Sequence, residues 1–420
     1  MFKEKENLKK ELWQRVEKTL FTLYGETPDA RILKRFYDEK MFFGNTDTII
    51  LWDIVADIRL EAKHQGHLTN LTGTDSSCFV AYLMGASDIN PLELHYHCPN
   101  CGKIEFIENK RALPFDIADK PCECGHNMRA DGFDIPYEMH VGKRAPWAHL
   151  NVASPFIKTA EKIVREKTQG IYRIVKLTKP NFEPLKFVFL PHDGNPDFEE
   201  NVDTVDDKYL NFPQITVAAP FGYDAATKLT NKTGVDFCEI LVNISNKQLS
   251  ESLLISEFAN GNTDGVLGFD FRNHPRLVGF KDDLRIASPQ TSYDLLKFLG
   301  AIHGTRNWLY NGNKLVKDGM CKIGDLPSHR DDVFILLRDE AKVHTNIALT
   351  IANKKSNRLR SNELTDNERN LLETLDMPPW FVTYIERVRY MGSKAAIVGT
   401  LRIALVFMWY KVNFPDKFEV

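Results

Sequence analysis

The chain has 420 residues, of which 43% are hydrophobic and 26% are charged, and its formal net charge is −3. This composition is typical of a globular protein with enough apolar residues for a large core, and it excludes a disordered, collagen-like or disulfide-stapled chain. The near-neutral charge also excludes a strongly basic nucleic-acid coat, but it is compatible with a local basic groove.

The sequence predicts an α+β fold, because a first half with strand-like alternation is followed by a second half with helical periodicity. The changes in pattern divide the chain into four consecutive regions. These are residues 1–91, helices and the first part of a sheet domain; 92–141, a cysteine-rich insertion; 142–235, the remainder of the sheet domain; and 236–420, a helical domain.

No segment has the length and composition expected of a signal sequence or a membrane span. Residues 1–6 carry charges and no apolar core, and the most apolar segment, 395–410, is interrupted by Arg402. That segment is shorter than the roughly 20 residues that cross a bilayer, and a central arginine is costly there. We therefore expect a buried core helix, no membrane partner and a cytoplasmic protein, in which the seven cysteines do not form disulfides.

Two closely spaced cysteine pairs form the strongest local motif. Cys98 and Cys101 form a Cys-x-x-Cys knuckle, Cys122 and Cys124 form a Cys-x-Cys knuckle, and a glycine follows each pair. Four thiolates at this spacing predict a tetrahedral zinc site in a zinc-ribbon-like insertion. The site would be structural, because four protein ligands leave no open position for a substrate water. Four free, buried cysteines are the alternative interpretation.

Around these cysteines the sequence resembles a known family. The run His95–Cys101 (His-Tyr-His-Cys-Pro-Asn-Cys) and the run Asp131–Glu138 (Asp-Gly-Phe-Asp-Ile-Pro-Tyr-Glu) resemble PolC, the replicative DNA polymerase III alpha subunit of the Gram-positive type. The resemblance covers about residues 18–412 and implies a polymerase-beta-like nucleotidyltransferase palm with a zinc insertion, followed by α-helical fingers. Other segments that resemble this family, in the same order, are residues 23–25, 76–81, 302–309, 330–332, 379–381 and 389–395.

The departures from the family pattern fall on its chemistry. The PolC palm carries a Pro-Asp-x-Asp-Leu-Asn motif whose two carboxylates hold catalytic magnesium, and here Trp147 and His149 stand at those positions. Ala219 corresponds to the third carboxylate, allowing for a slip of one residue. Two-metal phosphoryl transfer needs anionic oxygens to hold the ions. The resemblance therefore implies no catalytic residue in this cleft, and magnesium is not an expected cofactor.

The nucleotide-binding parts of the family also differ here. The loop after Leu71 contains no arginine and gains Asp75, and Ala396 and Thr400 replace the His and Tyr of the fingers motif. The thumb helices are expected to be reduced or absent, as are the other domains of the family. An acidic cluster from 193 to 207 is interpreted as a solvated loop or, alternatively, as a site for a hard cation.

One basic run and one lysine of the fingers motif are candidates for contacts to DNA phosphates. A solvated basic loop is the alternative for the run. The residues are Lys354, Lys355, Arg358, Arg360 and, by the resemblance, Lys394. Trp147 is expected to plug the former cleft, to stack on a base or only to fill space.

Together these features predict a catalytically inactive PolC-like replicase core, a pseudo-polymerase rather than an enzyme. It would bind replisome proteins or DNA and interfere with DNA replication, and a phage or another mobile element is the expected source. One alternative is a divergent DNA polymerase or nucleotidyltransferase with relocated metal ligands such as Asp206 and Asp207. The other is a structural subunit that pairs with another polymerase chain.

Overall fold

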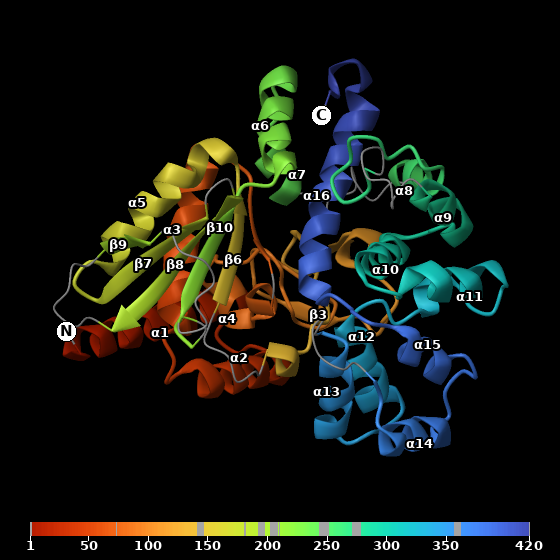
Figure 1. The fold of residues 1–420 in the computed structure, drawn as a ribbon. Coiled ribbons are helices and arrows are strands. Elements are labelled where there is room, and N and C mark those ends of the chain that lie inside the picture. The colour runs from red at the N-terminus through yellow and green to blue at the C-terminus, as the bar shows by residue number, and fades with distance from the viewer. Residues whose placement is uncertain are drawn as a thin grey trace.

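A computed structural model gives the fold, and it is α+β as the sequence predicts. A six-stranded sheet with its helices occupies one side of the molecule, helices alone occupy the other, and helix α16 (Lys394–Asn413) runs between them (Figure 1). The structure describes residues 2–72, 74–140, 147–179, 182–191, 198–201, 209, 211–242, 252–270, 279–356 and 363–419.

Three helices open the chain: α1 (Phe2–Tyr24), α2 (Ala30–Phe43) and α3 (Thr48–His64). Helix α1 packs on the core through Val16 and Leu20, which are buried. Asp29 begins α2, since its carboxylate accepts a hydrogen bond from the backbone N–H of Arg31 at 2.8 Å. Helix α3 is apolar on most of its surface and is buried between α1 and the sheet.

The large sheet has the strand order β1-β6-β10-β8-β7-β9. Strand β6 pairs with β1 antiparallel and with β10 parallel, β8 is antiparallel to both β10 and β7, and β9 is parallel to β7. The strands are β1 (Thr69–Thr72), β6 (Trp147–Val152), β7 (Tyr172–Lys179), β8 (Phe182–Pro191), β9 (Phe198–Asn201) and β10 (Gln214–Ala218).

One face of this sheet is covered by α3 and by α5 (Ile157–Thr168), and it forms one of the two large cores with Leu150, Val152 and Phe187. The opposite face of β1 lies against α16. Gly399 of α16 makes this approach close, because a Cβ there would lie 2.7 Å from the side-chain amide of Asn70. The segment in which thumb helices were expected to be reduced forms the hairpin β7–β8.

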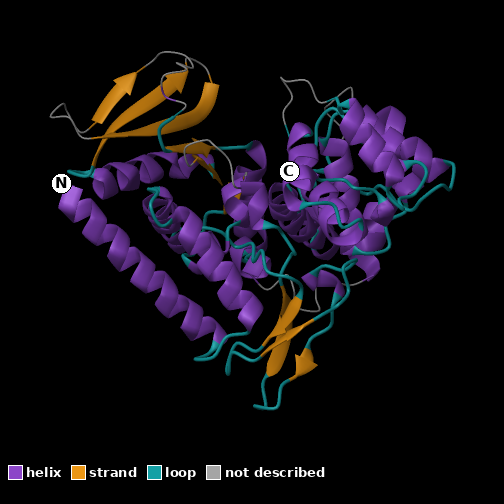
Figure 2. Cartoon of the chain, turned by 90° about the horizontal axis from the view of Figure 1, so that it is seen from below, coloured by secondary structure: helices purple, strands orange, loops and turns teal. Residues whose placement is uncertain are grey.

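The cysteine-rich insertion is a small antiparallel sheet with the order β3-β2-β5-β4. It projects away from the large sheet and the helices (Figure 2). It is anchored on the end of α1, where the His97 ring lies 2.8 Å from the backbone oxygen of Leu23. The strands are β2 (His95–His97), β3 (Ile104–Phe106), β4 (Lys120–Pro121) and β5 (Asn127–Asp131).

Short helices surround α16 in the second half of the chain and share one continuous core with it. They follow the order α6 (Phe221–Thr233), α7 (Phe237–Val242), α8 (Ser252–Ala259), α9 (Phe280–Ala287), α10 (Ser292–His303), α11 (Asn313–Lys317), α12 (Arg330–Ile335), α13 (Thr345–Lys354), α14 (Asp366–Thr374) and α15 (Phe381–Arg387). Helix α4 (Phe79–Leu83) lies earlier in the chain, against α2.

Helix α16 is apolar on all sides, as expected of a helix that is surrounded by protein. Among the described residues it is the single helix long and apolar enough to cross a membrane, and 72% of its most apolar window is buried inside the protein. Arg402 is buried as well, and its guanidinium donates to the backbone oxygens of Asp88 and Leu241 at 3.3 and 3.4 Å. The prediction of a buried core helix is confirmed.

Candidate functional site

Strand β6 carries Trp147 and His149, the two residues that the sequence analysis matched to the PolC carboxylate positions. Side chains alternate along a strand, so Trp147 and His149 point to one face, while Ala148 and Leu150 are buried on the other. The register places Thr72 of β1 and Thr216 of β10 on either side of His149. Strands β1, β6 and β10 therefore present a row of neutral side chains, Thr72, His149 and Thr216, on this face.

Trp147 lies across this row. Its indole Nε1 donates a hydrogen bond to Oγ1 of Thr216 at 2.8 Å, and the ammonium of Lys186 lies 5.1 Å from the ring centroid. The indole is 46% exposed, so it is held by these contacts and still presents one surface to solvent. The aromatic ring of Trp147 is therefore fixed across β6 and β10.

His149 is neutral at physiological pH. Burial lowers the pKa of its imidazole below the usual value, because a buried site disfavours the charged form. A neutral imidazole is a ligand for transition metals and a poor one for magnesium. Deeper in the same face, Asn151 donates to the hydroxyl of Tyr223 at 3.3 Å, which adds further neutral groups.

The described carboxylates nearest to this face are engaged or protonated. Asp224 accepts hydrogen bonds from both the backbone N–H and the hydroxyl of Ser154, each at 2.7 Å, and so caps the turn after β6. Asp75 lies in the turn after β1, and burial raises its pKa to about 7. A carboxyl group that is about half protonated at neutral pH is a weaker ligand for a hard cation than a full carboxylate.

The third carboxylate position was assigned to Ala219, which comes directly after the last residue of β10. The β10 residue opposite His149 is Thr216, and its hydroxyl is the one that contacts Trp147. The register therefore favours Thr216 as the third position. Asp206 and Asp207, the proposed relocated ligands, lie outside the described residues, as does most of the acidic cluster.

The four predicted zinc ligands do come together. The sulfur atoms of Cys98, Cys101, Cys122 and Cys124 all lie within 4.8 Å of one another. Two of the S···S distances are 3.5 and 3.7 Å, close to the about 3.8 Å that a tetrahedron with Zn–S bonds of about 2.3 Å requires. The cluster can hold a metal ion such as zinc.

The surroundings of the cluster suit thiolate ligands. Gly102 and Gly125 have φ values of +72° and +85°. Their backbone N–H groups donate hydrogen bonds to the backbone oxygens of Cys98 and Cys122, at 2.9 and 3.0 Å. The two knuckles therefore have the tight turns that the sequence predicted. The backbone N–H of His126 lowers the pKa of Cys124 to about 5, which favours the thiolate even before a metal binds.

The lysines predicted to contact DNA have partners inside the protein. Lys355 is fully buried and donates to the backbone oxygen of Val388 at 3.2 Å, and Lys394 is buried with its ammonium 3.1 Å from the backbone oxygen of Asp134. Both ammonium groups therefore have partners inside the protein, and the two DNA contacts stay predictions. Lys354 forms an ion pair with Glu368, and the predicted Arg358 and Arg360 lie outside the described residues.

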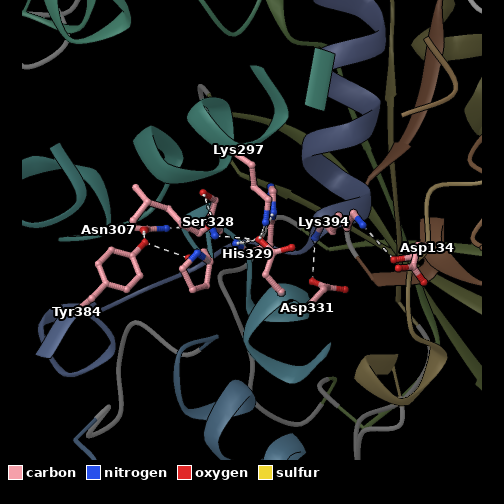
Figure 3. Close-up of polar contacts among 11 residues, drawn as sticks. Asp134, Lys297, Asn307, Ser328, His329, Asp331, Tyr384 and Lys394 are labelled. Atoms are coloured by element: carbon pink, nitrogen blue, oxygen red, sulfur yellow. Dashed lines mark hydrogen bonds and ion pairs between the residues drawn. The ribbon is translucent and has the colours of Figure 1, made fainter. Parts of the chain in front are cut away.

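Lys394 belongs to a buried polar network that sequence reasoning did not identify (Figure 3). Asp332 accepts from the ammonium of Lys297 and from Nδ1 of His329, both at 2.9 Å, and Asp331 accepts from the backbone N–H that begins α16, also at 2.9 Å. Burial acts to raise the pKa of Asp332, but the charges of Lys297 and His329 hold it well below the usual range. The network joins α10, α12 and α16, and Lys394 extends it to the cysteine-rich insertion.

No protein-family model matches the chain. It is similar to curated proteins named DNA polymerase III PolC-type. The one from Thermotoga petrophila is 23% identical over 96% of this chain and 34% of its own length. Those from Streptococcus suis and Clostridium perfringens are each 25% identical over 94% of this chain and 31% of their own length.

The chain is therefore PolC-like along nearly its whole length, and the resemblance inferred from its motifs is confirmed. It spans about a third of the length of these curated relatives. This similarity shows that the chain is related to replicases.

Proposed function

We propose that this chain is a PolC-like palm and fingers unit that binds DNA or a replication protein and does not carry out phosphoryl transfer. In this proposal the six-stranded sheet is the nucleotidyltransferase palm, the cysteine-rich insertion holds a structural zinc ion, and the helical half is the fingers. By occupying a primer–template or a replisome protein without extending DNA, the chain would interfere with replication.

The observation that carries the proposal is the hydrogen bond from Trp147 to Thr216, which fixes an indole over the two central strands. Two-metal catalysis needs carboxylates on these strands to neutralise and position both ions. On the described part of this face the row consists of an indole, a neutral imidazole and hydroxyl groups, which supply no anionic oxygen.

This face can still bind a partner, because an indole with one exposed side can stack on a base or fill a partner's pocket. The similarity to DNA polymerases along the whole chain supports DNA or the replication machinery as the partner. A structural role beside another polymerase chain would use the same surface and is an outcome of the binding experiment below.

Primer extension tests the proposal. The purified chain is incubated with a primer–template, all four deoxynucleotides and Mg²⁺ or Mn²⁺, with a PolC-type DNA polymerase III as the positive control. We expect no extension by this chain, and we expect it to bind the primer–template or to retain a replication protein from a cell extract.

Sustained, template-directed synthesis would overturn the proposal, and its loss in the Asp206→Asn/Asp207→Asn variant would establish relocated metal ligands. A chain that neither extends a primer nor binds DNA or a replication protein would contradict the binding function.

A further inference from the structure

A strained, exposed tyrosine lies on the surface of the helical half. Tyr310 has φ 60° and ψ 17°, which is the left-handed region, inside the short π-helical segment Trp308–Gly312. A residue with a bulky side chain is rare there and costs about 1 kcal/mol or more. Its ring is nonetheless 87% exposed, the highest value among the large apolar and aromatic side chains in the described part of the protein.

The segment is held rigidly from its buried side. Trp308 is buried in the core, and the side-chain amide of Asn311 donates to the backbone oxygens of Arg306 and Tyr384, each at 3.0 Å. The backbone N–H of Gly312 closes the turn on the oxygen of Asn307 at 3.1 Å. The fold therefore fixes the backbone of Tyr310 in a costly conformation and presents its ring to solvent, where the ring adds nothing to the core.

Exposed cations lie next to Tyr310 in the chain or on the helices α11 and α15, which contact its segment. Arg306 precedes the segment, and its backbone is also left-handed, at φ 52°. Arg387 ends α15, and Asn311 donates to the backbone oxygen of Tyr384 in the same helix. Lys314 and Lys317 follow on α11. Among the described residues none of these four cations has an ion-pair partner within 4 Å. The residue directly after α11 is acidic, Asp318.

We propose that Tyr310 and these cations form a binding site for single-stranded DNA, separate from the sheet face that carries Trp147. An unpaired base stacks on the Tyr310 ring, and Arg306, Arg387 and the two lysines of α11 contact the adjoining phosphates. An exposed aromatic ring among cations is the arrangement with which proteins bind single strands without reading sequence. The choice of DNA over a protein partner rests on the proposed function, whereas the site itself rests on the geometry.

Fluorescence anisotropy with a labelled oligothymidylate tests the site in the full chain. Tyr310→Gly is the informative variant, because glycine adopts the same φ without strain and the variant is expected to fold and to melt at a higher temperature than the wild type. We expect its affinity for the single strand to fall about tenfold, as for the loss of one stacked base. Tyr310→Trp should retain the affinity, and wild-type binding should weaken steeply with salt.

Tyr37→Ala is the matched control, since Tyr37 is a half-exposed tyrosine on α2 with ordinary helical geometry. It should bind the oligonucleotide as the wild type does. The site is overturned if Tyr310→Gly binds as tightly as the wild type, or if the wild type does not bind the oligothymidylate at all. In the first case binding of a primer–template and the lack of primer extension would stand, so the two proposals fail separately.

Discussion

At the scale of single residues, Asp332 has the largest number of defined contacts to buried donors. Besides Lys297 and His329, the backbone N–H groups of Ser328 and His329 donate to the same carboxylate oxygen at 2.8 and 3.0 Å. The buried ammonium of Lys297 depends on this oxygen, and its pKa is raised above the usual value because the charge of Asp332 outweighs the effect of burial.

Replacing Asp332 by asparagine should therefore be strongly destabilising. The ammonium of Lys297 would stay buried without its counter-charge, which typically costs about 3–5 kcal/mol. The free energy of unfolding in urea measures the effect. Asp282→Asn is the control, since Asp282 is exposed and its ion pair with Arg285 is worth less than about 1 kcal/mol. Equal stability of the two variants would contradict this role for Asp332.

The same carboxylate predicts how stability depends on pH. The pKa of Asp332 is lower in the folded chain than its ordinary value of 3.8, so its contribution is complete above that value and is lost as the pH falls through the folded pKa. We expect the free energy of unfolding to fall more steeply below about pH 4 for the wild type than for Asp332→Asn. Parallel pH profiles for the two proteins would contradict the assignment.

At the residue scale, chemistry that is local in the chain could be predicted from the sequence, whereas burial could not. The four cysteines were identified because their spacing fixes both knuckles within a few residues of the chain. Lys355 and Lys394 were taken for DNA contacts because a lysine in a basic run or motif looks solvated, and its burial depends on Val388 and Asp134, which lie far away in the sequence. Tyr310 carries no sequence signal, because its φ is set by the surrounding turn.

At the scale of elements, helix α10 packs against the turn that begins α12. Gly300 of α10 lies directly on the His329 ring, and a Cβ there would overlap the imidazole. The ring has no room to move, because it is fully buried and bonded to Asp332. A glycine in the middle of a helix is thus required by packing, although alanine is the better helix former.

Gly300→Ala should lower the melting temperature, since overpacking of this kind costs about 1–3 kcal/mol and exceeds the gain in helix propensity. Gly279→Ala is the matched control, because a Cβ at Gly279 meets no atom within 4 Å and its φ is −68°. The melting temperatures of both variants are measured by calorimetry. A Gly300→Ala protein as stable as Gly279→Ala would show that the two elements separate more easily than the structure indicates.

We expect the cysteine-rich insertion to depend on a bound metal ion, because its small sheet has a core of few residues, mainly Cys98, Cys122 and Met128. We expect about one equivalent of zinc per chain in elemental analysis, as for a four-cysteine site. Cys98→Ser should lose it and expose the insertion to proteolysis, whereas Cys238→Ser, at an isolated cysteine, should keep it. Full zinc content in Cys98→Ser would contradict the site.

Elements were predicted well in kind and less well in register. The α+β order, the insertion and the core helix α16 followed from periodicity and spacing. The pairing of β10 with β6 could not be predicted, because strand register is set by contacts between distant segments. The sequence analysis assigned Ala219 to the third carboxylate position, which stays a prediction, and the structure places Thr216 opposite His149.

At the scale of the whole molecule, α16 joins the three parts of the fold. Its first turn is held by Asp331 and reaches the cysteine-rich insertion through Lys394, its middle lies against β1 at Gly399, and Tyr410 donates to the backbone oxygen of Val235 at 2.6 Å. This arrangement keeps the sheet face beside the helical half.

Binding of Mn²⁺ to the sheet face tests the central claim most directly. Mn²⁺ is titrated into the zinc-loaded chain and its free signal is followed by electron paramagnetic resonance, in the wild type and in the Trp147→Asp/His149→Asp variant. The account predicts no tightly bound Mn²⁺ in the wild type and a new site in the variant, because two carboxylates return to β6. A pair of tightly bound Mn²⁺ ions in the wild type, lost in His149→Ala, would contradict it.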